Sequence, residues 1–199
     1  MKKLLLATAA AALMSGAASA DNVKLGILFG FTGPIESLTP PMAAGAEAAM
    51  AEVTASGKFM GGSSVESVRA DSTCVDSAAA TSAAERLITS DGIAGLIGGD
   101  CSGVTIAVLT NVAMANGTVM ISPSATSPAL TSIEDNGQSF RTSPSDARQG
   151  AVMTEIISER GYKEVALTYT NNDYGKGLAD AFQAAFEAAG GKVTISVSH

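Results

Sequence analysis

The sequence has 199 residues, a net charge of −7 at pH 7 and 46% hydrophobic residues. An acidic chain of this kind argues against nucleic acid and anionic membrane surfaces as partners. Two cysteines and one histidine are too few for a zinc-type ligand cluster, so we expect no metal site and no cofactor.

The first twenty residues have the three parts of a secretory signal peptide. Lys2 and Lys3 give a cationic start, an apolar stretch follows, and "ASA" directly precedes Asp21. The apolar stretch is too short to span a bilayer. We therefore expect residues 1–20 to be a signal peptide and the exported, soluble product to begin near Asp21.

Strands and helices alternate along the rest of the chain. Short apolar runs bounded by glycine or turn residues predict strands at 23–29, 64–70, 93–98, 118–122, 138–142, 164–170 and 192–198. Longer alanine-rich or amphipathic segments predict helices at 40–56, 76–90, 102–116, 146–160 and 175–189. This alternation predicts an α/β fold whose parallel sheet is covered by helices on both faces. The last strand is expected to have an unpaired edge.

Two helix starts carry capping signals. Asp76 is a plausible N-cap for the helix that follows it. Asp146 precedes Gln149 by three residues, which is the spacing of a capping box.

Three unusual loops follow predicted strands, and they are rich in glycine or hydroxyl side chains. They read "GFTGPIES", "GGDCSG" and "SPSATSP". Ligands of α/β sheets lie beyond the carboxyl ends of the strands, where these loops should meet. Helix N-termini at Ser102 and near Ser127 would direct backbone N–H groups there, which suits a carboxylate or another anion.

Cys101 lies in the second of these loops and has two interpretations. The stretch "GDCSG" fits a cysteine version of the nucleophile elbow, which would make the chain an exported α/β-hydrolase-like enzyme. A cysteine nucleophile needs a base, however, and the one histidine is the terminal His199. A second cysteine, Cys74, and an oxidising compartment favour a disulfide over catalysis.

Five stretches, in this order, resemble the leucine-binding-protein family of periplasmic solute receptors. They are "VKLGILFGFTGP", "RADSTCVDSAAATSAAERLITSDGIAGLIGGDCSG", "VMISPSATSPAL", "FRTSPSDARQG" and "TNNDYGKG". The resemblance implies a type I periplasmic binding fold and a periplasmic location. It also implies a branched-chain amino acid or similar small amino acid or amide as ligand, an inner-membrane ABC permease as partner, and a monomeric full-length parent. A receptor lobe that senses a ligand rather than transporting it would look the same.

The family's site residues can be placed on this sequence one at a time. Cys74 and Cys101 match the family's disulfide pair, and Ser102 matches a serine that contacts the ligand carboxylate. The resemblance further implies ligand contacts, through backbone or side chain, at Ser124, Ala125, Thr126 and Tyr174.

Two departures from the family pattern affect these expectations. Leu38 lies near a position where many relatives carry a cleft aromatic residue. The resemblance also implies two lobes, expected here at residues 21–142 and 143–199, with the second incomplete. The acidic residue that pairs with the ligand ammonium in relatives would then lie beyond His199, and we expect the chain alone to bind weakly.

Overall fold

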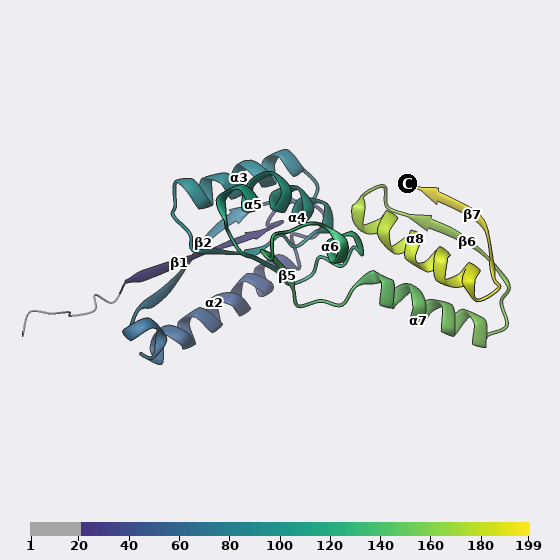
Figure 1. Cartoon of the computed structure of the whole chain (residues 1–199), viewed down its shortest axis with the longest axis horizontal. Helices are drawn as coiled ribbons and strands as arrows, with labels where there is room; N and C mark the ends of the chain where they lie inside the picture. The colour runs from purple at the N-terminus through teal and green to yellow at the C-terminus, as the bar shows by residue number, and fades with distance from the viewer. Residues whose placement is uncertain (1–20) are drawn as a thin grey trace, which may run out of the picture.

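The computed structural model describes residues 21–199, so the predicted signal peptide lies outside the described residues. Figure 1 shows two bodies: one holds β1 to β5, and the other holds α7, β6, α8 and β7. No helix within residues 21–199 is long and apolar enough to cross a membrane.

The larger body is built on a five-stranded parallel sheet with the order β2-β1-β3-β4-β5. Its strands are β1 (Asn22–Phe29), β2 (Ser64–Asp71), β3 (Gly95–Gly98), β4 (Met120–Ser122) and β5 (Ser139–Arg141). The sheet with its flanking helices confirms the predicted α/β class. Because all five strands run the same way, the loops after them meet at one edge of the sheet.

One face of this sheet is covered by α3 (Ser77–Thr89) and by the nearly continuous helix of α4 (Ser102–Val108), η3 (Leu109–Ala113) and α5 (Met114–Asn116). In α3 the buried residues Ala80, Ala84 and Leu87 recur at helical spacing and face the sheet. The Asp76 side chain accepts hydrogen bonds from the backbone N–H groups of Ala78 and Ala79, which confirms the predicted N-cap.

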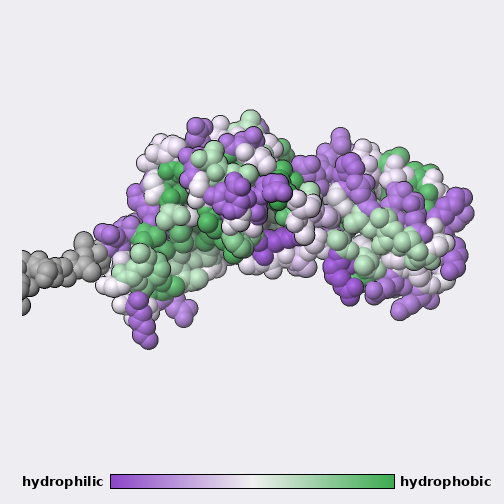
Figure 2. Space-filling model, in the orientation of Figure 1, coloured by the Kyte–Doolittle hydropathy of each residue, from purple (hydrophilic) through white to green (hydrophobic). Residues whose placement is uncertain are grey.

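The opposite face is covered by α2 (Thr39–Ala55), whose Ala43 and Met50 pack on β1. A cross-strand row on this face runs from Ile27 through Ile97 and Ile121 to Phe140. Ile27 is completely buried, whereas Ile121 is 39% and Phe140 54% exposed. The helix α2 thus covers the β1 end of the row and leaves its β4–β5 end exposed to solvent. Figure 2 shows apolar surface around α2.

The smaller body pairs β6 (Glu164–Tyr169) with β7 (Lys192–Ser198) in parallel. Helices α7 (Asp146–Glu159) and α8 (Asp173–Ala188) pack on each other, and Phe182 and Phe186 of α8 are buried. Within residues 21–199, β7 pairs with β6 alone, which confirms the expected unpaired edge.

Residues 142–145 connect the two bodies and contain one correction to the sequence analysis. The N-cap of α7 is Ser145, whose hydroxyl accepts a hydrogen bond from the Ala147 N–H, so the capping box predicted at Asp146 is wrong. Asp146 is instead the first helical residue and is buried against Thr126. The remaining elements are the short helices η2 (Phe59–Gly61) and α6 (Ala129–Ser132).

Candidate ligand-binding site

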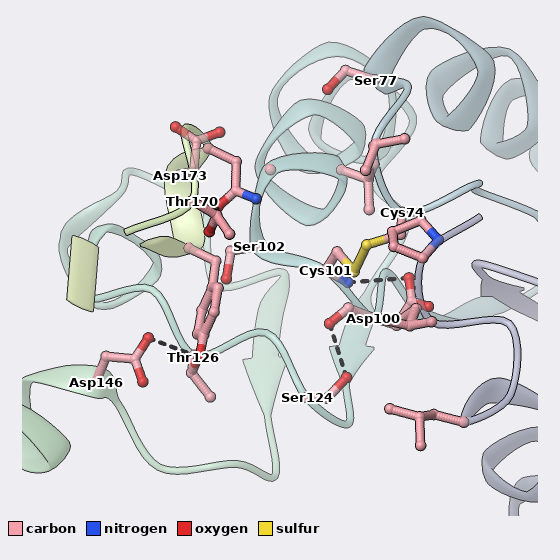
Figure 3. A pocket seen from close by; sticks show the side chains of 18 of the residues that line it. Cys74, Ser77, Asp100, Cys101, Ser102, Ser124, Thr126, Asp146, Thr170 and Asp173 are labelled. Atoms are coloured by element: carbon pink, nitrogen blue, oxygen red, sulfur yellow. Dashed lines mark hydrogen bonds between the residues drawn. A yellow bond between two sulfur atoms is a disulfide. The ribbon is translucent and has the colours of Figure 1, made fainter. Parts of the chain in front are cut away.

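A cavity of about 700 Å³ lies at the carboxyl ends of the strands. The larger body contributes the loops after β1 to β4, and the smaller body contributes the first turn of α7 and the residues that precede and begin α8. Figure 3 shows these segments converging on one space. Both bodies therefore bound the cavity. A ligand site that responds to the relative position of two bodies requires this arrangement.

The loop after β1 is held in place by Asp71 at the end of β2. Its carboxylate accepts hydrogen bonds from the hydroxyl and the backbone N–H of Thr32 and from the Thr73 N–H. Burial acts to raise the pKa of Asp71, but these hydrogen bonds outweigh it and the pKa lies below its usual value. Gly33 has φ of 95°, and an added Cβ would lie 2.5 Å from the Thr73 carbonyl oxygen, so this turn requires glycine.

Asp100 joins three of the loops at the cavity. It is buried, and its carboxylate accepts hydrogen bonds from the Gly30 N–H at 2.6 Å and from the Ser72 hydroxyl and the Cys101 N–H, each at 3.1 Å. The disulfide between Cys74 and Cys101 links two of the same segments covalently. The positions of the cavity loops are thus set by a buried carboxylate and a crosslink.

Ser102 begins α4 and lies beside the loop after β4. It is buried, and its hydroxyl oxygen accepts a hydrogen bond from the Ser127 N–H at 3.1 Å, which leaves the hydroxyl proton free to be donated. As the first residues of α4, Ser102 and Gly103 have N–H groups without an intrahelical partner. This end of the cavity therefore offers hydrogen-bond donors.

Thr126 separates donors from acceptors in the cavity. Its backbone N–H has no hydrogen-bond partner within residues 21–199. Its hydroxyl donates to Oδ2 of Asp146 at 2.8 Å, so the hydroxyl oxygen can accept a further hydrogen bond. A ligand with an anionic and a cationic group on adjacent atoms would find donors on one side of Thr126 and acceptors on the other.

The structure brings most of the residues singled out from the sequence to this cavity. Cys74, Cys101, Ser102, Ser124, Thr126 and Tyr174 all line it. The Ser124 hydroxyl, however, donates to the Asp100 carbonyl oxygen at 2.8 Å. Ala125 does not line the cavity: it is completely buried, and its N–H donates to the Ser122 hydroxyl.

Sequence reasoning missed several polar residues that line the cavity from the smaller body. These are Asp146, Gln149, Thr170, Asn171, Asn172 and Asp173. Four of them directly follow the strand β6, so the rule that places ligands at strand ends could have found them. Asp146 and Gln149 were assigned to a cap, and only the tertiary structure shows that they face the cavity.

Part of the cavity lining is apolar. It is formed by Pro34, Ile35, Leu38, Met42 and Val75. Leu38 is 59% and Val75 67% exposed, so both side chains are accessible to a molecule in the cavity. A cluster of three or more His, Cys, Asp or Glu residues that could hold a metal does not occur within residues 21–199.

The two bodies also contact each other through a glycine. An added Cβ at Gly177 of α8 would lie 2.8 Å from the Ser127 Oγ and 3.0 Å from the Pro128 Cδ. We expect Gly177→Leu to push α8 away from the loop after β4 and to widen the cavity. Small-angle scattering should show a larger radius of gyration with little loss of thermal stability, because the contact lies between the bodies.

Gly45→Leu is the matched control for this substitution. Gly45 also lies inside a helix, α2, but an added Cβ there would meet nothing within 4 Å. Identical scattering from Gly177→Leu, Gly45→Leu and the unchanged chain would contradict the contact.

Comparison with known proteins agrees with this architecture. The family model described as "Periplasmic binding protein" matches residues 22–199. The chain belongs to the periplasmic binding protein family. A relative, Leu/Ile/Val-binding protein homolog 3 of Brucella melitensis, is 33% identical over 190 residues, which are 94% of this chain and 50% of the relative. The name of this relative says that it binds leucine, isoleucine and valine.

Solved structures of periplasmic binding proteins share the fold. LivJ of Streptococcus pneumoniae in complex with isoleucine is 30% identical with a TM-score of 0.76, covering 90% of this chain and 50% of LivJ. A solute-binding protein of R. palustris in complex with benzoate is 25% identical with a TM-score of 0.78, covering 89% of this chain and 48% of that protein. The chain thus spans about half the length of these relatives.

Proposed function

We propose that this chain belongs to the periplasmic solute-binding component of an ABC transporter and captures a branched-chain amino acid or a similar small amino acid or amide. The ligand would lie between two lobes, residues 21–142 and 143–199, and an inner-membrane permease would receive it. The names of the relatives support the class of ligand. A signal peptide over residues 1–20 would export the chain to the periplasm.

The observation that carries this proposal is the arrangement around Thr126. The Ser102 hydroxyl and the Thr126 N–H are free donors suited to a carboxylate, and acceptor oxygens lie on the far side of Thr126. The apolar wall that includes Leu38 would receive an aliphatic side chain. Binding in this cavity would favour the arrangement in which the two bodies are close together.

The hydrolase alternative has no comparable support. Cys101, which would have to be the nucleophile, is bonded to Cys74, and the described residues contain no free cysteine. The relatives reported above are named for binding rather than for catalysis. We therefore propose binding without chemical conversion of the ligand.

Ser102→Ala tests the proposal because it removes one of the two free donors. We expect leucine, isoleucine or valine to shift the backbone amide resonances of residues 102–104 and 126 in the unchanged chain. The substitution should weaken this binding by roughly 10- to 100-fold, since a hydrogen bond to a charged group contributes roughly 1.5–3 kcal/mol. The measurement is a nuclear magnetic resonance titration extended into the millimolar range, which also detects weak binding.

Thr105→Ala is the matched control. Thr105 is buried in the same helix and its hydroxyl donates to the Cys101 carbonyl oxygen, but it does not line the cavity. The proposal fails if Thr105→Ala weakens binding as much as Ser102→Ala, or if none of the three amino acids binds saturably to the unchanged chain.

A further inference from the structure

Two neighbouring residues between β2 and α3 have a backbone conformation that side chains rarely adopt. Thr73 has φ of 56° and Cys74 has φ of 67°, and they are the only adjacent non-glycine residues with positive φ within residues 21–199. This left-handed region is unfavourable for a β-branched residue such as Thr73, because its side chain crowds the backbone. Such a conformation persists only where the surrounding structure holds it. We call Thr73 and Cys74 the strained turn.

The disulfide is what connects the strained turn directly to another loop. Among the described residues, the hydrogen bonds of Thr73 and Cys74 all stay within the segment 71–76. The bond from Cys74 to Cys101, in contrast, reaches the loop after β3. Figure 3 shows it beside Asp100 at the cavity. The disulfide therefore holds the strained turn against the rest of the larger body.

The strained turn lies against the loop after β1. An added Cβ at Gly30 would lie 3.1 Å from the Cβ of Cys74, and one at Gly33 would lie 2.5 Å from the carbonyl oxygen of Thr73. The loop after β1 continues into residues 34–38, and Pro34, Ile35 and Leu38 line the cavity. Val75, which directly follows the strained turn, lines the cavity as well. A movement of this turn would thus shift most of the apolar lining.

We propose that the disulfide, by holding the strained turn, positions the apolar lining, so that a preference for aliphatic ligands depends on the oxidised state of Cys74 and Cys101. Through this link a reductant that opens the bond would change what the cavity selects. The inference rests on the proposed function, because it assigns the origin of ligand selectivity in the same cavity.

A dithiol can carry out the reduction. Cys74 and Cys101 line the cavity and are half-buried, so the bond is open to a small molecule. One thiolate of the dithiol attacks a sulfur of the pair, the S–S bond breaks, and a mixed disulfide forms. The second thiolate then displaces the cysteine, so the dithiol ends as a disulfide and both cysteines end as thiols after gaining two electrons and two protons. The strained turn is then free to leave the left-handed region.

The test compares leucine with alanine in the oxidised chain and in the chain reduced by excess dithiothreitol. Alanine has the same carboxylate and ammonium but three fewer side-chain carbons. We expect the oxidised chain to prefer leucine by roughly 10- to 100-fold, the range for burying three further carbons. The reduced chain should lose most of this preference while binding alanine about equally well. Nuclear magnetic resonance titration measures all four affinities.

The same coupling must appear in the opposite direction. If reduction weakens the binding of leucine by a given factor, saturating leucine must lower the equilibrium constant for reduction by that factor. Saturating alanine should leave this constant nearly unchanged. The fraction of reduced chain at fixed ratios of reduced to oxidised dithiothreitol gives the constant.

Thr73→Gly tests the strain without any ligand. Glycine adopts the left-handed region without crowding, so the oxidised variant is relieved of strain and its disulfide should be about fivefold harder to reduce at equilibrium. Asn136→Gly is the matched control, because Asn136 also has positive φ, at 53°, but lies in the loop before β5. It should leave the reduction equilibrium unchanged. Equal effects of the two variants, or none from Thr73→Gly, would overturn the inference.

The binding data can overturn the inference separately from the proposed function. Equal losses of leucine and alanine affinity on reduction would indicate a general role in stability, and so would a reduced chain that circular dichroism shows to be unfolded. An unchanged preference for leucine refutes the inference and leaves capture of amino acids intact. An oxidised chain that binds neither amino acid refutes both proposals.

Discussion

Loss of the disulfide between Cys74 and Cys101 is expected to lower the free energy of unfolding by about 3–4 kcal/mol. The two residues are 27 positions apart, and a crosslink over a loop of this length restricts the unfolded chain by that amount. The measurement is urea unfolding of the oxidised chain and of the double variant Cys74→Ser, Cys101→Ser. The expected signature is a lower urea concentration at the transition midpoint. The unfolding free energy of the variant should also depend more steeply on urea, because the uncrosslinked unfolded state exposes more surface.

A reducing agent provides the matched comparison for the disulfide. It should destabilise the unchanged chain by the same amount and leave the double variant unaffected, because the variant has no sulfur–sulfur bond to lose. A loss of less than about 1 kcal/mol in the double variant would contradict the expectation from the loop length.

Asp100→Asn is expected to destabilise the protein by about 2–4 kcal/mol. The carboxylate accepts from Gly30, Ser72 and Cys101, whereas an amide has one accepting oxygen and an NH₂ group that must face a donor. At least one buried donor is therefore left without an acceptor. Thermal and urea unfolding of the variant measure the effect.

Asp135→Asn serves as the control for this substitution. Asp135 also accepts two backbone hydrogen bonds, from Gly137 and Ser139, but in a loop at the surface. Water can replace lost partners there, so the expected change is about 0.5 kcal/mol or less. Equal destabilisation by Asp100→Asn and Asp135→Asn would show that burial of Asp100 does not matter.

The order of strands and helices could be predicted because local patterns determine it. Buried strands such as β1 are short apolar runs that end at glycine, and α3 carries both a capping aspartate and apolar residues at helical spacing. The start of α8 shows the limit of this reasoning. The prediction began the helix at Gly175, whereas Asn172 caps it through the Gly175 N–H and the helix begins at Asp173.

The candidate site was predictable where it follows from strand ends and not where it depends on packing. Ser102 and Thr126 were placed by the rule that loops after parallel strands converge. Asp146 could not be placed this way, since an acidic residue at a helix start has the same sequence signal whether it caps or faces a cavity. Ala125 shows the reverse: its position between two cavity residues says nothing about which way it points.

The uneven covering of the five-stranded sheet has a consequence for handling the protein. Ile121 and Phe140 form an exposed apolar strip, whereas Ile27 in the same row is buried beneath α2. Apolar strips of this kind drive contacts between molecules whose interiors are fully intact. We therefore expect any association of this chain to use a surface of its folded state, so that conditions which only stabilise the fold would not reduce it.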